Sequence, residues 1–162
     1  MNDAGFIPQR KVYAYTQTIN ALPEEVFPLL CPVREAEWLD EWDYSMIYSV
    51  TGFAEPGAVF STSSPGEQDT IWIVTKHDRQ NMIVEFTRFT PFNRTCVVSI
   101  RARQFNEACS SVDIEYVYVS LSEEGNDYLR NYSKDEFDKN MKFWEDSMNH
   151  YIATGTLLKK KK

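Results

Sequence analysis

The sequence predicts an α+β protein in which a curved antiparallel sheet wraps around one long C-terminal helix. Strand-like segments follow one another from Tyr44 to Leu121 with short turns between them, a spacing typical of antiparallel neighbours. The chain then continues into an amphipathic helical pattern between Ser133 and Gly155. Its 162 residues are enough to bury one sizeable core without a disulfide scaffold or a structural metal.

The N-terminal quarter predicts a strand followed by two short helices. Lys11–Asn20 is rich in Tyr, Thr and Val, which favour strands. Pro23 suits the first position of a helix, and the two acidic residues after it suit the positive end of the helix dipole. Pro28 limits this helix to a couple of turns, and a second short helix is expected over Val33–Leu39.

Further strands are predicted between these helices and the C-terminal helix, which gives a sheet of about seven strands. Turn-forming residues separate the segments, so consecutive strands are expected to pair antiparallel. The predicted strands are Tyr44–Val50, Ala58–Ser63, Asp69–His77, Met82–Thr90, Arg94–Gln104 and Ala108–Leu121.

Alternation of polar and apolar residues assigns an inner face to the last three strands. In Asp69–His77 two alternatives remain open, with either Trp72 and Val74 or Ile71 and Ile73 facing inward. The assigned inner-face residues are Met82, Val84, Phe86 and Arg88, then Cys96, Val98, Ile100 and Ala102, then Val112, Ile114, Tyr116 and Tyr118.

The C-terminal helix has recognisable ends and a continuous apolar face. Ser133 and Glu136 have the spacing of a capping box at its start, and Gly155 is typical of a C-terminal stop. Phe143 lies on the opposite stripe, either as a dimer or partner contact or as an ordinary exposed aromatic. The apolar face comprises Phe137, Met141, Trp144, Met148, Tyr151 and Ile152.

Charge is distributed unevenly along the chain. The formal net charge is −7, from 17 Lys and Arg against 24 Asp and Glu, although four lysines stand together at Lys159–Lys162. The remaining body is therefore strongly acidic and should repel a phosphate backbone, so nucleic-acid binding is not expected. We expect one domain over residues 1–158 and a disordered lysine tail after it.

Location and assembly follow from what the sequence lacks. It has no apolar leader segment and no run of about 18 apolar residues, so stable membrane insertion is not expected. Cys31, Cys96 and Cys109 lack the close spacing of a zinc or redox motif and should be buried, reduced thiols. We expect a cytoplasmic protein that is a monomer or a homodimer.

Several short motifs occur in an order that resembles the START/birch-pollen-allergen superfamily, also called SRPBCC or polyketide cyclase/dehydrase-like. They are Ile19–Phe27 (INALPEEVF), Trp38 and Trp42, Gly57–Phe60 (GAVF), Phe143–Trp144 and Tyr151–Gly155 (YIATG). The resemblance covers about Val12 to Leu158 and implies the helix-grip fold. It also implies a hydrophobic cavity between the sheet and the long helix, used in this superfamily to bind lipids, sterols, hormones or polyketides. A minority of its members catalyse cyclisation or dehydration.

The candidate ligand-binding residues are the large side chains predicted to face that cavity. Aromatic rings and adaptable methionines suit an apolar ligand, and buried Tyr hydroxyls and Trp N–H groups can orient its polar end. The alternative is that these side chains simply fill the core. The candidates are Phe60, Trp72, Phe86, Arg88, Tyr116, Tyr118, Met141, Trp144 and Met148.

Arg88 is the most specific of these candidates. A guanidinium that points into an apolar interior needs a carboxylate partner, from the protein or from a ligand such as a fatty or aromatic acid. The alternative is that Arg88 lies near the end of its strand and reaches solvent.

The sequence contains no recognised catalytic motif. His77 and His150 are far apart, no ligand set for a metal has suitable spacing, and no nucleophile or phosphate-loop motif occurs. No metal or cofactor is expected, and no catalytic residue is singled out. Three functions remain: binding of a small hydrophobic or amphipathic ligand, a polyketide cyclase/dehydratase-like activity, or a chaperone-activator-like role in which a surface binds a protein.

Overall fold

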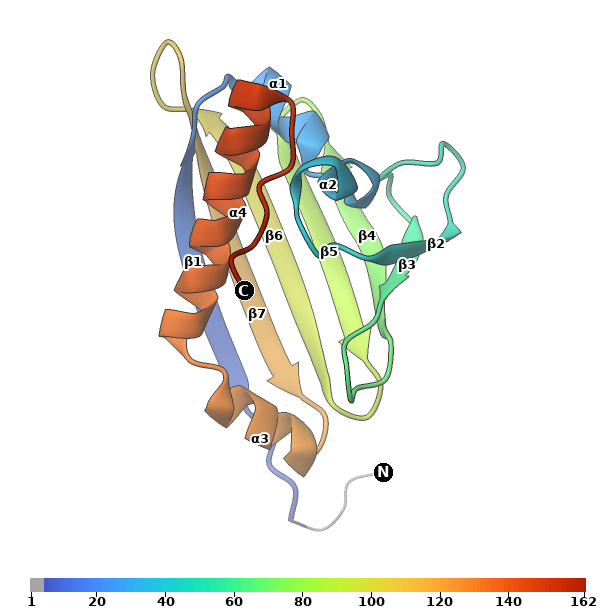
Figure 1. Cartoon of the computed structure of the whole chain (residues 1–162). Helices are drawn as coiled ribbons and strands as arrows, with labels where there is room; N and C mark the ends of the chain where they lie inside the picture. The colour runs from blue at the N-terminus through green and yellow to red at the C-terminus, as the bar shows by residue number, and fades with distance from the viewer. Residues whose placement is uncertain (1–4) are drawn as a thin grey trace.

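The computed structural model describes residues 5–162 as one sheet with all helices on one of its faces (Figure 1). The elements follow the order that the sequence predicts, with one additional helix. They are β1 (Arg10–Ile19), α1 (Pro23–Val26), the 3₁₀ turn η1 (Phe27–Leu29), α2 (Pro32–Trp38), β2 (Tyr44–Tyr48), β3 (Val59–Thr62), β4 (Thr70–Asp78), β5 (Ile83–Thr90), β6 (Arg94–Gln104), β7 (Ser110–Ser120), α3 (Glu123–Asn131) and α4 (Lys134–Thr154).

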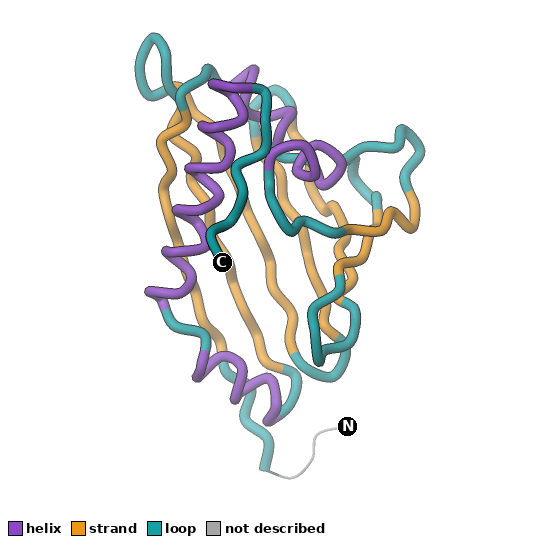
Figure 2. The backbone as a smooth tube through the Cα atoms, viewed as in Figure 1, coloured by secondary structure: helices purple, strands orange, loops and turns teal. Residues whose placement is uncertain are grey.

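The sheet has seven strands in the order β1-β7-β6-β5-β4-β3-β2, and every neighbouring pair is antiparallel. From β2 to β7 each strand therefore lies beside the next one in the chain. The first strand, β1, lies at the other edge, beside the last strand β7. Helices α1 and α2 cover one end of the strands and α3 covers the other, while α4 lies along β1 and β7 (Figure 2). Between α4 and α2 the concave face of the sheet is the place where a ligand cavity is expected.

The predicted inner face is confirmed. Val84, Val98 and Val112 are buried on adjacent central strands, as alternation requires. In β4 the structure selects the first of the two alternatives, because Trp72 and Val74 are buried whereas Ile73 is 41% exposed on the outer face.

Helix α3 was not predicted and is a correction to the expected element order. Ser122 caps it by accepting a hydrogen bond from Gly125 N at 3.1 Å, and Leu129 buries its apolar side against the core. Gly125 comes so close to the turn after β5 that a Cβ at this position would lie 1.9 Å from the carbonyl oxygen of Asn93. Glycine is therefore required for this helix to pack.

Helix α4 begins and ends where the sequence predicts. The Ser133 hydroxyl accepts from Glu136 N at 3.1 Å, and Gly155 adopts the left-handed conformation with φ 69°. On the inner side, Phe137, Met141 and Met148 are buried.

The C-terminal segment, residues 156–162, runs back over the concave side between α4 and the loop after α2 (Figure 1). Leu158 forms an isolated parallel bridge with Leu39, and Lys160 N donates to the Asp40 carboxylate at 2.9 Å. The Lys160 ammonium lies 5.8 Å from the centre of the Phe143 ring, which is half-buried. Phe143 is thus covered by its own chain rather than presented as a free aromatic.

The thiol prediction is correct for two of the three cysteines. Cys31 and Cys96 are buried free thiols, whereas Cys109 is half-buried, at the start of β7. No helix in residues 5–162 is both long and apolar enough to cross a membrane.

Candidate ligand cavity

Two adjoining cavities lie between the concave face of the sheet and the helices. The wide cavity has a volume of about 530 Å³ and is lined by β5, β7, α3 and the start of α4. The narrow cavity, of about 110 Å³, lies deeper under α2, with walls from β3 to β7 and α4. They share Arg88 and Tyr116 as wall residues, so both side chains can contact a molecule in either cavity.

Most of the predicted ligand residues line these cavities. Arg88 and Tyr116 face both, while Met148 lies in the core and lines neither. Of the others, Tyr118 and Met141 line the wide cavity, and Phe60, Trp72, Phe86 and Trp144 line the narrow one.

The narrow cavity has a rigid aromatic wall. Phe60 and Trp72 stack at 5.4 Å between ring centres, and Phe86 meets the Trp72 ring edge-on at 6.0 Å. The Trp72 indole N–H donates to the Thr62 hydroxyl at 2.9 Å, which fixes the orientation of the ring. Because these rings hold one another in place, they leave a preformed flat surface for an apolar ligand.

Arg88 lies opposite Trp72 in the register of β4 and β5, between this aromatic wall and the tyrosines of β7. Its guanidinium lies 4.9 Å from the ring centre of Trp72 and 5.1 Å from that of Tyr116, and it donates to the Tyr118 hydroxyl. Within residues 5–162, no carboxylate lies within ion-pairing distance of it. A half-buried cation is thus held in place by rings and a hydroxyl without a matching negative charge.

Arg94 provides a comparison, because its guanidinium is buried and is paired within the protein. It is 8% exposed, pairs with both carboxylate oxygens of Glu67 at 3.0 and 3.1 Å, and stacks 3.4 Å from the centre of the Tyr128 ring. Arg88 has the stacking contacts but not the carboxylate.

The two tyrosines beside Arg88 remain neutral phenols. Burial raises the pKa values of both Tyr116 and Tyr118 well above the ordinary value, even though the Arg88 charge opposes this shift. Their hydroxyl groups can therefore take part in hydrogen bonds to a ligand without adding negative charge.

Glu35 is a site residue that the sequence analysis missed. It is 4% exposed and lines the narrow cavity, and no side-chain hydrogen bond or ion pair reaches its carboxyl from the described part of the chain. Burial raises its pKa from 4.5 to about 8. Its position in α2, three residues before the fully buried Trp38, is the signal that places both side chains on one helical face.

Helix α3 and the residue after it form a wall of the wide cavity that the sequence analysis did not predict. Tyr128 and Tyr132 stack at 5.7 Å and both line the wide cavity. The Tyr132 hydroxyl accepts from the Asn140 amide at 3.2 Å, which ties α3 to α4 at the cavity rim.

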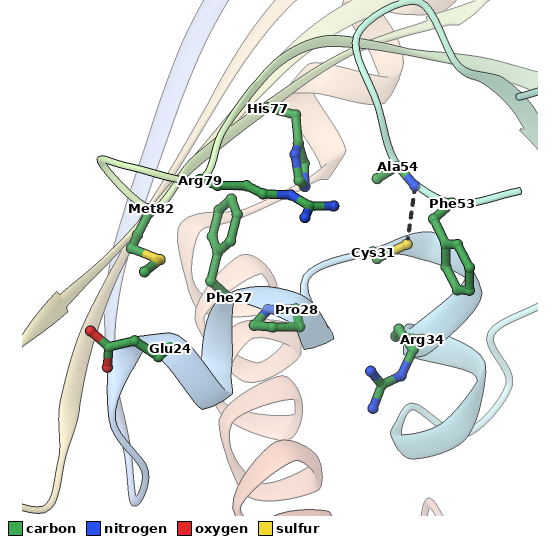
Figure 3. Close-up of a pocket in the computed structure, with 10 residues that line it drawn as sticks. All are labelled: Glu24, Phe27, Pro28, Cys31, Arg34, Phe53, Ala54, His77, Arg79 and Met82. Atoms are coloured by element: carbon green, nitrogen blue, oxygen red, sulfur yellow. Dashed lines mark hydrogen bonds between the residues drawn. The ribbon is translucent and has the colours of Figure 1, made fainter. Parts of the chain in front are cut away.

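A third pocket, of about 400 Å³, lies apart from these cavities (Figure 3). It is bounded by η1 and the start of α2 on one side and by the β4–β5 hairpin on the other, and Arg79, His77 and Phe27 lie around it. Partial burial and the nearby charge of Arg79 lower the pKa of His77. None of the predicted ligand residues lines this pocket, and its Cys31 thiol accepts a hydrogen bond from Ala54 N at 3.3 Å.

Comparison with known proteins identifies the fold. No family model and no curated protein sequence matches the chain. Among solved structures, norcoclaurine synthase from Thalictrum flavum matches with a TM-score of 0.67 at 11% identity, over 91% of this chain and 88% of that one. The Zhui aromatase/cyclase from Streptomyces sp. R1128 matches with a TM-score of 0.65 at 9% identity, over 93% and 100% of the two chains.

Ara h 8.0201 matches in the same way, with a TM-score of 0.60 at 10% identity over 90% of this chain and 99% of that one. At these identities the comparisons establish architecture. They agree with the seven-stranded sheet, the two short helices after β1 and the long α4. The chain therefore has the helix-grip fold that these solved structures share and that its sequence resemblance implies.

Proposed function

We propose that the chain binds a small amphipathic molecule with an anionic group in the two adjoining cavities. Its apolar body packs against the tyrosines of the wide cavity and the aromatic wall of the narrow one. Its anionic oxygens accept hydrogen bonds from Arg88, where both cavities meet. Aromatic and fatty carboxylates have this chemistry.

The observation that carries the proposal is the missing carboxylate at Arg88. A half-buried guanidinium without a negative partner is costly. Within residues 5–162 the comparable Arg94 has Glu67 as its partner, whereas Arg88 has no equivalent carboxylate. An anionic ligand would complete the set of contacts that the rings and the Tyr118 hydroxyl begin.

Cavity size and a structural neighbour also support binding. A volume of about 530 Å³ is within the range of small-molecule sites and favours binding over a role that uses only the surface. One structure of norcoclaurine synthase with the same fold is a complex with dopamine and hydroxybenzaldehyde, two small aromatic molecules.

Replacing Arg88 with Met tests the proposal, because methionine keeps the bulk of the side chain and removes the charge. We expect affinity for a carboxylate such as 3-phenylpropanoate to fall about ten- to hundredfold, the usual value of a charge-assisted hydrogen bond. Affinity for the matched amide, 3-phenylpropanamide, should change little. Isothermal titration calorimetry gives both values, and native mass spectrometry of the purified protein identifies any ligand already bound.

The matched control is Arg101→Met, since Arg101 is an exposed arginine on the outer face of β6. It should bind both compounds as the unaltered protein does. Equal losses for the carboxylate and the amide in Arg88→Met, or no binding of either compound by the unaltered protein, would contradict the proposal.

A further inference from the structure

We infer that this cavity also catalyses reversible proton transfer at a carbon atom beside a carbonyl group, with Glu35 carrying the proton and Arg88 holding the enolate oxygen. The inference rests on the proposed function, because the substrate has to bind with its oxygen atoms at Arg88. It adds a reaction and a substrate class, the 2-oxo acids with an apolar substituent.

The placement of Glu35 is the first support. It projects from α2 into the narrow cavity, where its carboxyl has neither an ion pair nor a side-chain hydrogen bond within residues 5–162. A carboxyl buried only for structural reasons is expected to have hydrogen-bond partners, because burying an unsatisfied polar group is costly. This side chain is instead free to contact a molecule in the cavity.

The geometry of the two cavities is the second support, and it selects the substrate class. The narrow cavity of about 110 Å³ holds a group of only a few atoms, whereas the wide one of about 530 Å³ accepts an aromatic or aliphatic body. Arg88 lines both cavities, and its planar fork suits two adjacent oxygens. A 2-oxo acid presents its carboxylate and its carbonyl oxygen side by side, with the acidic carbon next to them.

The charge balance of the site agrees with proton transfer. The titratable groups that line the narrow cavity with Glu35 are Arg88 and Tyr116, and both keep their protonation state near neutral pH. Because burial raises its pKa to about 8, Glu35 can both release and accept a proton near neutrality, as a general acid–base group must.

The step balances without any co-reactant. The Glu35 carboxylate removes one proton from carbon 3 of the 2-oxo acid, the electron pair of that C–H bond forms the C2–C3 double bond, and the carbonyl pair moves to the oxygen. Arg88 donates hydrogen bonds to the resulting enolate oxygen. Before the reverse step, the carboxyl proton of Glu35 exchanges with heavy water. Glu35 then delivers a deuteron to carbon 3, and the net result is replacement of hydrogen by deuterium at that carbon.

The test is deuterium incorporation into carbon 3 of phenylpyruvate in heavy water, followed by NMR with the buffer rate subtracted. We expect Glu35→Gln to lower the protein-catalysed rate by at least about a hundredfold while phenylpyruvate affinity stays within a fewfold of the unaltered protein. Glu24→Gln, which changes an exposed carboxyl on α1, is the matched control and should exchange at the normal rate.

A pH profile of the unaltered protein tests the inference even if Glu35→Gln fails to fold. The value of kcat/KM should rise about tenfold per pH unit and level off above pH 8, because the base form of Glu35 is populated above its pKa. Glu35→Gln should lose this inflection.

The outcomes separate the two proposals. Phenylpyruvate that binds through Arg88 but exchanges no faster than in buffer, or equally fast in Glu35→Gln, overturns the catalytic inference and leaves the binding proposal intact. Phenylpyruvate that binds equally well to Arg88→Met overturns the binding proposal, and the catalytic inference with it.

Discussion

Glu35 and Arg88 line the same cavity, one from α2 and one from β5, and yet they do not form an ion pair. If they had paired, the carboxyl would be held ionised and both groups would be structural. Their separation instead leaves a carboxylic acid and a guanidinium in one apolar chamber. At neutral pH the site therefore offers a fixed positive charge and a separate neutral donor.

The raised pKa of Glu35 has a consequence for stability. The folded state keeps this proton up to about pH 8, while the unfolded chain releases it near pH 4.5. The bound proton therefore adds to the free energy of unfolding at low pH, and this stabilisation is lost as the pH rises from about 4.5 to about 8. The stability of the unaltered protein relative to Glu35→Gln should therefore fall by up to about 1.4 kcal/mol per pH unit across this window. Urea unfolding of both proteins between about pH 5 and pH 9 measures the difference.

Glu24→Gln serves as the matched control for this measurement, because it removes an exposed carboxyl that lines neither the wide nor the narrow cavity. A constant difference for Glu35→Gln would mean that the Glu35 carboxyl is ionised in the folded protein.

At the scale of elements, α3 depends on the absence of a side chain at Gly125. Replacement by Ala puts a methyl group against the Asn93 carbonyl, where the nearest atom is 1.9 Å away, so either α3 or the β5–β6 turn must move. We expect Gly125→Ala to lose roughly 1–3 kcal/mol of stability despite the higher helix propensity of Ala.

Chemical unfolding of Gly125→Ala and of Glu124→Ala checks this expectation. Glu124 is the exposed neighbour of Gly125 in the same helix, so its replacement should change stability by only about 0.5 kcal/mol. A stabilised Gly125→Ala would show that helix propensity outweighs the close contact.

The elements that the sequence predicted and those it missed differ in the strength of their local signal. Strict alternation in β5 to β7 places Arg88 on the inner face without any knowledge of the fold. Helix α3 contains Gly125, Asn126 and Asp127 in succession, which are poor helix formers, and its stability comes from packing that a local pattern does not contain. In β4 both faces are apolar, so alternation alone could not select the inner one.

The site shows the same division. The aromatic wall follows from strand periodicity. In the seven-residue α2 the only signal for Glu35 is its single i, i+3 spacing to Trp38, which is too short a pattern to mark a charged residue as buried. The wide cavity itself depends on how far α3 and α4 stand from the sheet, and that distance is a property of the packed molecule.

At the scale of the whole molecule, the C-terminal segment joins α4 to the loop after α2. Lys159 and Lys160 lie near Asp40 and Glu41, with ammonium-to-carboxylate distances of 3.2 Å for both pairs. The hydrogen bond from the Lys160 amide lowers the pKa of the Asp40 carboxyl, and the hydrogen bond and charge of the Lys159 ammonium lower it further. These exposed ion pairs are individually weak and are screened by salt.

The expected disorder of the lysine tail stays a prediction, and hydrogen exchange of the Lys160 amide tests the contact directly. In the contact described here, that amide should be protected at low ionic strength and should lose protection near 1 M salt, because screening removes the attraction. Asp40→Asn should reduce the protection at low salt as well. An amide that is unprotected at every salt concentration would support the disordered tail.

The two edge strands of the sheet, β1 and β2, differ in whether a helix accepts hydrogen bonds from their outward backbone N–H groups. Along β1, the backbone N–H groups of Thr18 and just beyond it Asn20 donate to Glu145 and Asn149 of α4, at 2.7 and 2.8 Å. These donors are therefore closed to another chain, whereas β2 at the opposite edge has a strand partner on one side only. Sheet extension from β2 by a second copy would join identical edges and leave the two β1 edges outside. At one end of each β1 edge, α4 already occupies the donors of Thr18 and Asn20, so a further strand could not pair with the sheet there.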